Sequence, residues 1–149
     1  MNSRFAVAVH ILTLLEQADG APVTSERMSQ SINTNPSLVR RLLGVLAQAG
    51  ITTSQMGAGG GATLARSAAE VTLLDVYRAV DEGEVFAMPR EAPSPYCMVG
   101  RNIQASLEAS MNAARSALEA ELARTTIAEM LTRVRRQETS RVANARQAK

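Results

Sequence analysis

The apolar residues of this 149-residue chain recur mainly at helical spacing, and the pattern changes to alternation in one short stretch. Ser3–Ala18 is apolar around much of its circumference, which predicts a buried first helix. Two shorter helices follow. The first carries Met28 and Ile32 inward. The second places a set of apolar residues on one face: Leu38, Leu42, Val45 and Ala49, with Leu46 beside them.

The ends of these two short helices are marked by residues that satisfy free backbone groups. Thr24 is a suitable N-cap for the first helix, since its hydroxyl can accept a backbone N–H bond. Asn35 is an N-cap for the second helix and Pro36 suits its first position, where a missing N–H costs nothing. Gly50 closes the second helix in a left-handed conformation. Two short helices joined by a tight turn are typical of a helix-turn-helix.

A β-hairpin is predicted directly after the second short helix. Ile51–Gln55 is rich in β-branched residues, Gly57–Gly61 is a glycine turn, and Ala62–Ala65 returns. A hairpin at this place is a wing.

Beyond the hairpin the pattern becomes helical again. Thr72 and Asp75 have cap spacing, so a short helix is expected from about Leu73 to Asp81, ended by Gly83. Three prolines make 85–98 an irregular surface loop.

The last third of the chain predicts two helices and a tail. The long helix spans Gly100–Arg124. Thr126 and Glu129 form a capping box that starts a short helix over about Ile127–Arg136. The remaining residues, 137–149, are polar and basic, and we expect them to be disordered.

The expected fold class is mainly α with a small β-hairpin wing: a winged helix-turn-helix domain followed by a long C-terminal dimerisation helix. The expected organisation is a DNA-binding domain over 1–82, a possible sensor loop over 83–99, dimerisation helices over 100–136 and a basic tail over 137–149.

The long helix carries one continuous apolar seam, made of Ile103, Leu107, Met111, Ala114, Leu118 and Leu122. A small winged domain has little surface left to cover a seam of this length. The simplest partner is a second copy of the same helix related by two-fold symmetry. An intrachain core helix shows the same spacing, so that alternative stays open.

The charge pattern favours double-stranded DNA as a partner. No Asp or Glu occurs from Arg27 to Ala69, although the net charge is only +2. The outer side of the second short helix carries Ser37, Arg40, Arg41, Gly44 and Gln48. The candidate DNA-binding residues are Thr24, Ser25, Asn35, Pro36, Ser37, Arg40, Arg41, Gln55, Gly57, Gly59 and Gly60. The wing has no Lys or Arg between Gln55 and Ala65, which weakens the expectation of minor-groove reading.

Composition narrows the remaining classes. The single cysteine excludes an internal disulfide, and with no signal peptide or membrane span we expect a cytoplasmic protein without membrane contact. No catalytic or phosphate-loop constellation is present, so an enzyme is not expected. His10 is interpreted as a satisfied core or interface histidine, because no second ligand lies near it in the sequence, and no metal site is expected.

Several runs together resemble the Rrf2 family of bacterial transcription regulators, over Ser3 to about Leu131. These runs are Asn33–Pro36, Val39–Leu43, Ala49–Ile51, Gly57–Arg66, Val71–Val80 and Cys97–Gln104. The resemblance implies a homodimeric winged-helix protein, in most members a repressor, that binds a near-palindromic operator. Several members sense iron–sulfur status, nitric oxide, thiols or oxidants.

The chain departs from the iron–sulfur members of that family at the loop. Those members have three cysteines there, whereas only Cys97 is present here, so we expect no iron–sulfur cluster and no other cofactor. Cys97 precedes the long helix, whose N-terminus stabilises a thiolate. We interpret it as a redox or electrophile sensor; a small buried packing residue is the alternative. For the whole chain, the alternative is a dimeric interaction or small-ligand-sensing module with weak or lost DNA binding.

Overall fold

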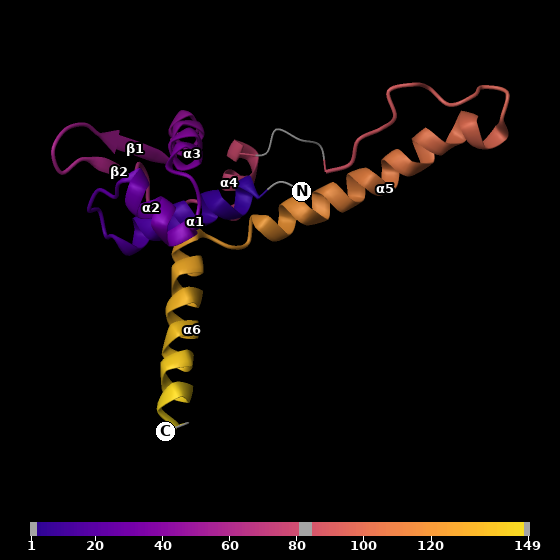
Figure 1. Ribbon diagram of the computed structural model, residues 1–149. Helices are drawn as coiled ribbons and strands as arrows, with labels where there is room; N and C mark the ends of the chain where they lie inside the picture. The colour runs from indigo at the N-terminus through magenta and orange to yellow at the C-terminus, as the bar shows by residue number, and fades with distance from the viewer. Residues whose placement is uncertain (1–2, 81–84, 148–149) are drawn as a thin grey trace.

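The structure, a computed structural model, describes residues 3–80 and 85–147 of the chain (Figure 1). Its elements in chain order are α1 (Arg4–Gln17), α2 (Ser25–Ile32), α3 (Pro36–Gln48), β1 (Thr52–Gln55), β2 (Gly61–Leu64), α4 (Leu73–Val80), α5 (Met98–Leu122) and α6 (Ile127–Gln147). The mainly helical fold with a two-stranded antiparallel wing is confirmed.

An aliphatic core holds α1 to α4, the hairpin and the first turns of α6 together. Its largest fully buried side chains are Ile11, Leu12, Met28, Val39, Leu42, Leu46, Ile51, Val71, Val76, Val80 and Ile127. Burial of each such side chain contributes about 1.5–3 kcal/mol, so aliphatic residues alone can stabilise this unit despite the few aromatics. One edge-to-face pair, Phe5 of α1 with Tyr77 of α4, lies at the side of the core.

The wing is tied to the segment that precedes α2. β1 and β2 pair in antiparallel register from Thr52 with Leu64 to Gln55 with Gly61. Val23 then exchanges both backbone hydrogen bonds with Ala62, at 3.0 and 2.9 Å. Because Val23 immediately precedes the cap of α2, the wing and the helix-turn-helix are held in one fixed arrangement.

The start of α6 returns to the same unit. Leu73 N–H donates to the Thr125 carbonyl and Ile127 N–H donates to the Val71 carbonyl, each at 2.9 Å. The expected cap of α4 is present as reciprocal bonds between Thr72 and Asp75. The expected capping box of Thr126 and Glu129 begins α6. α6 therefore packs on α1 at its N-terminal end only.

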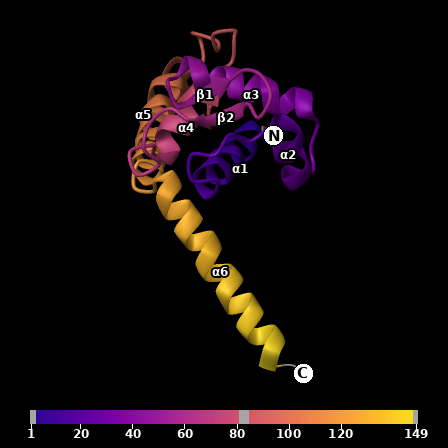
Figure 2. The same ribbon diagram turned by 90° about the vertical axis from the view of Figure 1, so that its left-hand side faces the viewer.

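α5 leaves the winged unit as a separate arm, and Figures 1 and 2 show α5 and α6 projecting in different directions. Within the described chain no residue of α5 is buried. The irregular segment 85–97 runs back along α5 (Figure 1). Phe86 of this segment shares a surface hollow with Met111 and Arg115 of α5. The expected irregular surface loop is thus present, and it runs along α5.

Two helix boundaries differ from the sequence prediction, and three predicted positions cannot be compared. α5 begins at Met98 and ends at Leu122, where Gly100 and Arg124 were expected. The expected end of α4 at Asp81 and Gly83, and the domain boundary at 82, lie outside the described residues.

The expected disordered tail is wrong as far as Gln147, because α6 continues to that residue. The reason is intrinsic propensity: 137–147 contains neither glycine nor proline and is rich in Arg, Ala, Gln and Glu. Thr139 and Ser140 also donate their hydroxyls to carbonyls one turn back, on Arg135 and Arg136. Absence of large apolar residues was therefore a poor guide to order here.

Candidate nucleic-acid interface

The N-termini of α2 and α3 are both capped as the sequence predicts. The Thr24 hydroxyl accepts from Arg27 N–H at 3.3 Å, and the Asn35 side-chain oxygen accepts from Ser37 N–H at 2.8 Å. Pro36 occupies the first position of α3. Helix N-termini with free N–H groups are suited to hold phosphate, and Thr24 and Asn35 lie at two of them.

The turn between the helices is closed by a left-handed residue. Asn33 has φ 56° and ψ 54°, and Thr34 N–H donates to the Ser29 carbonyl at 3.0 Å. This short reversal sets α3 across α2, and the two helices share the core through Met28 and Leu42. The arrangement is a helix-turn-helix.

The outward face of α3 is the one expected. Ser37, Arg40, Arg41, Gly44 and Gln48 are all exposed. The inward face is turned slightly from the prediction: Val39, Leu42 and Leu46 are fully buried, whereas Leu38 and Val45 are half-buried and Ala49 is exposed. The spacing of apolar residues in the sequence fits two adjacent faces of α3. Only the packing of α3 against α1 and β1 decides which of the two faces is buried.

Arg40, one of the two arginines of α3 among the candidate DNA-binding residues, is bound by two side chains of α2. Its Nη2 lies 2.5 Å from Glu26 Oε1, and its Nε donates to Ser25 Oγ at 3.2 Å. The Glu26 backbone N–H and then the Arg40 guanidinium hold the pKa of Glu26 below its ordinary value of 4.5. Glu26 is therefore ionised at neutral pH, and it places a carboxylate beside the outward face of α3.

The other arginines of the acid-free stretch divide into two groups. Arg66 lies 3.5 Å from Asp75 of α4, so its charge is directed to the body of the domain. Arg27 and Arg41 are exposed and their side chains make no hydrogen bond or ion pair with the residues that the structure describes. Of the two arginines on α3, Arg41 is therefore the one whose side chain has no partner among the described residues.

The wing presents backbone and one apolar side chain. Gln55, Gly57 and Gly59 are exposed, and Gly57 and Gly59 have φ 96° and 75°. At Gly60 a Cβ would lie 2.3 Å from the Gln55 carbonyl oxygen, so the tight turn itself requires this glycine. Sequence reasoning missed Met56, which is 96% exposed at the tip; its isolation among glycines was the available signal.

The predicted sensor and dimer residues lie on the α5 arm, away from α3 (Figure 1). Cys97 is the N-cap residue of α5 and is exposed, so the alternative of a buried packing residue is wrong for the single chain. Ile103 and Leu107 are 43% and 46% exposed; Ala114 is exposed; Met111, Leu118 and Leu122 are half-buried. An intrachain core role for the seam is therefore not supported.

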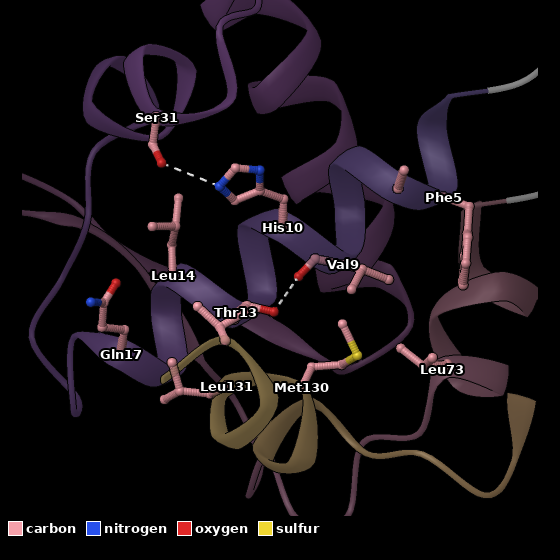
Figure 3. Close-up of a pocket in the computed structure, with 12 residues that line it drawn as sticks. Phe5, Val9, His10, Thr13, Leu14, Gln17, Ser31, Leu73, Met130 and Leu131 are labelled. Atoms are coloured by element: carbon pink, nitrogen blue, oxygen red, sulfur yellow. Dashed lines mark hydrogen bonds between the residues drawn. The ribbon is translucent and has the colours of Figure 1, made fainter. Parts of the chain in front are cut away.

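His10 lies on the rim of an apolar groove between α1 and α6. Its Nε2 is 3.2 Å from Ser31 Oγ of α2 (Figure 3). The residue is exposed, so of the two expected roles, core or interface histidine, the core role is wrong and the interface role stays a prediction. The groove has a volume of about 660 Å³, and its apolar lining includes Val9, Leu14 and Met130. The groove is thus lined by residues of α1 and α6 together with Ser31 of α2, the first helix of the helix-turn-helix.

The residues present do not fit an iron–sulfur cluster in one protomer. Among the described residues no group of three His, Cys, Asp or Glu side chains could hold a metal ion. Cys97 is the chain's single cysteine, whereas clusters are usually held by four ligands.

No helix in the described ranges is long and apolar enough to cross a membrane.

A helix-turn-helix with an outward basic helix and an adjoining hairpin defines the winged helix-turn-helix class, which is a class of DNA-binding folds. Residues 1–133 match the family model Rrf2, described as "Iron-dependent Transcriptional regulator". The chain belongs to the Rrf2 family, which is a family of transcriptional regulators and not of enzymes.

Individual relatives agree with this assignment. Over 131 residues the chain is 40% identical to "Putative HTH-type transcriptional regulator YwnA" of Bacillus subtilis (strain 168), covering 88% of this chain and 96% of YwnA. A crystal structure described as "a putative DNA binding protein" is 38% identical, with a TM-score of 0.70, and covers 87% of this chain and 99% of its own.

Two structures with lower sequence identity show a likeness of fold only. A structure described as "a putative transcriptional regulator from Lactobacillus plantarum" superposes with a TM-score of 0.76 at 24% identity, with full coverage of both chains. IscR of T. potens superposes with a TM-score of 0.64 at 21% identity, covering 90% of this chain and 87% of its own.

Proposed function

We propose that this protein is a homodimeric repressor that reads a near-palindromic DNA operator through α3 and responds to oxidants through Cys97. The observation that carries the DNA-binding part is the outward face of α3, where Arg41 is exposed and its side chain has no partner among the described residues. Repression, in preference to activation, is supported by the resemblance to Rrf2 regulators.

The dimer is supported by the unpartnered seam of α5. The helix has 25 residues, or about 37 Å of length, and none of its residues is buried. Among the helices described, α4 makes a limited contact with it, and Ile103, Leu107 and Ala114 of the seam stay exposed. Pairing of two such seams about a two-fold axis would bury several leucines, each contributing about 1.5–3 kcal/mol. Two α3 helices spaced by roughly one DNA turn, 34 Å, would then meet two half-sites.

Within each half-site, Ser37, Arg40 and Arg41 are assigned to the major groove. An arginine donates two hydrogen bonds to guanine O6 and N7, which is the commonest specific contact in such interfaces. Thr24, Ser25, Asn35 and Pro36 lie at the helix N-termini and are assigned to phosphates. Gln55, Gly57, Gly59 and Gly60 are assigned to backbone approach by the wing, which brings no cation of its own.

The test is selection of preferred duplexes from random DNA by the purified protein, followed by titration of the selected and a random duplex over a salt series. Arg41→Ala should weaken binding to the selected site by about 1–3 kcal/mol if Arg41 reads a base. Arg136→Ala is the matched control, since it removes the same charge from exposed α6. Absence of any sequence preference in the wild type would refute the proposal and favour an interaction module.

The oxidant response is supported by the exposure of Cys97 at the start of α5. Attack of the thiolate on hydrogen peroxide breaks the O–O bond, leaves a sulfenic acid on sulfur and releases water after protonation. Peroxide should therefore lower operator affinity in the wild type but not in Cys97→Ser, and a thiol reductant should restore it.

Met56 needs its own control in that experiment. It is 96% exposed on the wing and is a competing target of peroxide. Met56→Leu should respond like the wild type. Release of the operator by Cys97→Ser as readily as by the wild type would end the sensor proposal without affecting the DNA-binding one.

The proposed regulator works without an iron–sulfur cluster or other cofactor. Even a dimer supplies only two Cys97 thiolates, fewer than the four ligands that clusters usually take. Protein purified without oxygen should therefore carry no stoichiometric iron or sulfide and should show selective binding as isolated. Stoichiometric iron with visible cluster absorption would contradict this part.

A further inference from the structure

Arg40 is held from two sides by the first turn of α2. Ser25 Oγ accepts from Arg40 Nε at 3.2 Å, and Glu26 Oε1 lies 2.5 Å from Arg40 Nη2. Ser25 Oγ also lies 3.2 Å from Glu26 Oε2, so the two α2 side chains support each other. We call these three residues the Ser25–Glu26–Arg40 cluster. It joins residues 14 and 15 positions apart, on the two helices of the helix-turn-helix.

The cluster places a carboxylate where a DNA-binding surface would ordinarily exclude one. Glu26 is the last acid before the acid-free stretch that ends at Ala69, and both Glu26 and Arg40 side chains are 58% exposed. A carboxylate beside phosphates opposes binding, so a purely electrostatic interface would gain by losing it. Helix stabilisation by an acid in the first turn does not explain why Arg40 reaches across to it.

The geometry leaves part of the guanidinium free. Arginine offers five N–H donors in a planar fork. The bonds to Ser25 and Glu26 use the Nε donor and one Nη2 donor. The two Nη1 donors and the second Nη2 donor remain, and these suffice for a bidentate bond to guanine O6 and N7.

We propose that Glu26, with Ser25, is a positioning residue that holds Arg40 for a base edge and keeps it from the phosphate backbone. This inference rests on the proposed DNA-binding function. An unpaired arginine on this surface is free to turn to the nearest phosphate, a contact that carries no sequence information. Pairing with a carboxylate neutralises that attraction and restricts the side chain to one orientation, so Arg40 contributes selectivity more than affinity.

The experiment compares Glu26→Gln, Glu26→Asp, Arg40→Ala and the double variant Glu26→Gln/Arg40→Ala with the wild-type protein. Each is titrated against the selected operator, the same operator with every base pair substituted singly, and a random duplex, at several salt concentrations. Glu138→Gln, which removes the same charge from the exposed part of α6, is the matched control.

Arg40→Ala should lose the preference for one G·C pair in each half-site, a preference of roughly 5- to 150-fold for a bidentate arginine. Glu26→Gln should lose most of the preference at the same pair while it binds the random duplex more tightly. Its dependence on salt should steepen by about one phosphate contact, because Arg40 is released to the backbone. The double variant should show no further loss of preference beyond Arg40→Ala.

Glu26→Asp separates position from charge, because it keeps the negative charge and shortens the reach to Arg40. It should lose base preference, and its salt dependence should steepen less than that of Glu26→Gln, because the retained carboxylate still opposes the phosphates. Tighter binding of Glu26→Gln to every duplex with base preference intact would overturn the inference, since Glu26 would then be only a repulsive charge. Losses by Glu26→Gln and Arg40→Ala at different base pairs would overturn it equally. Lack of any selective wild-type binding would instead refute the proposed function.

Discussion

Gly61, the first residue of β2, lies directly against the backbone of Val23. A Cβ on Gly61 would come 2.6 Å from the Val23 carbonyl oxygen, and Gly61 has φ 155°. The next residue, Ala62, exchanges two hydrogen bonds with Val23. The wing can therefore approach the start of α2 only because position 61 lacks a side chain.

Gly61→Ala should accordingly destabilise the domain by about 1–3 kcal/mol, measured by urea unfolding followed by circular dichroism. Gly59→Ala is the control: it also has a positive φ, 75°, but no atom lies within 4 Å of the added Cβ. Its cost should be limited to backbone strain of about 1–2 kcal/mol. Equal stability of the Gly61 variant and the wild type would show that the wing is not anchored at Val23.

Gly44 should separate stability from DNA binding. It lies in the exposed face of α3, and nothing lies within 4 Å of an added Cβ. Gly44→Ala should raise the free energy of unfolding by about 0.5–1 kcal/mol, because alanine has the higher helix propensity. If α3 lies in the major groove, the added methyl group should also weaken operator binding.

The control for Gly44→Ala is Ser116→Ala on exposed α5. It should be stabilising by roughly half a kcal/mol and leave operator affinity unchanged. Unchanged operator affinity in Gly44→Ala would mean that DNA does not approach α3 closely at this position.

Local signals made much of the fold predictable. The Thr24 and Asn35 caps and the Thr126–Glu129 capping box each satisfy backbone groups within three residues, so the sequence alone carries the information. The prediction of a disordered tail was wrong because it relied on the amphipathic pattern, which fades after Val134. Helix propensity, which is also a local property, continues beyond that residue, and α6 extends to Gln147.

The candidate site was predictable as a set of residues but not as an arrangement. Arg40 and Arg41 are neighbours with the same chemistry, and sequence patterns assign them the same role. Only the crossing of α2 over α3 brings Glu26 to Arg40 and leaves Arg41 free. The exposure of His10 beside Ser31 likewise depends on how α1 meets α2, a relationship that periodicity within one helix does not contain.

Glu26 should titrate below its ordinary pKa of 4.5, because its backbone N–H and then Arg40 favour the carboxylate. A lowered pKa in the folded state means that the contribution to stability is present above the unfolded-state pKa and is lost as pH falls through the folded-state pKa. NMR titration of the side-chain carboxyl measures it. Arg40→Ala should raise this pKa only part of the way, since the backbone contribution remains. A wild-type pKa at or above 4.5 would contradict the observed pairing.

Leu107 tests the seam of α5. It is 46% exposed in the protomer, so Leu107→Glu should leave the winged unit folded and its circular dichroism unchanged. In a dimer the same change buries an unpaired charge in the centre of the interface, which is strongly unfavourable. Size-exclusion chromatography with light scattering should therefore show a dimer for the wild type and a monomer for Leu107→Glu. Affinity for a two-half-site operator should fall more than affinity for a single half-site, because the link between two α3 helices is lost.

Ser116→Glu provides the matched control for Leu107→Glu. Ser116 is exposed and lies nine residues further along α5, half a turn round the helix from Leu107. It should remain dimeric and retain operator affinity. A dimeric Leu107→Glu protein would place the interface elsewhere, whereas a monomeric Ser116→Glu protein would show that α5 is covered on both sides and is not paired through one seam. Only a monomer from the first variant together with a dimer from the second agrees with an interface built on Ile103, Leu107, Ala114 and Leu118.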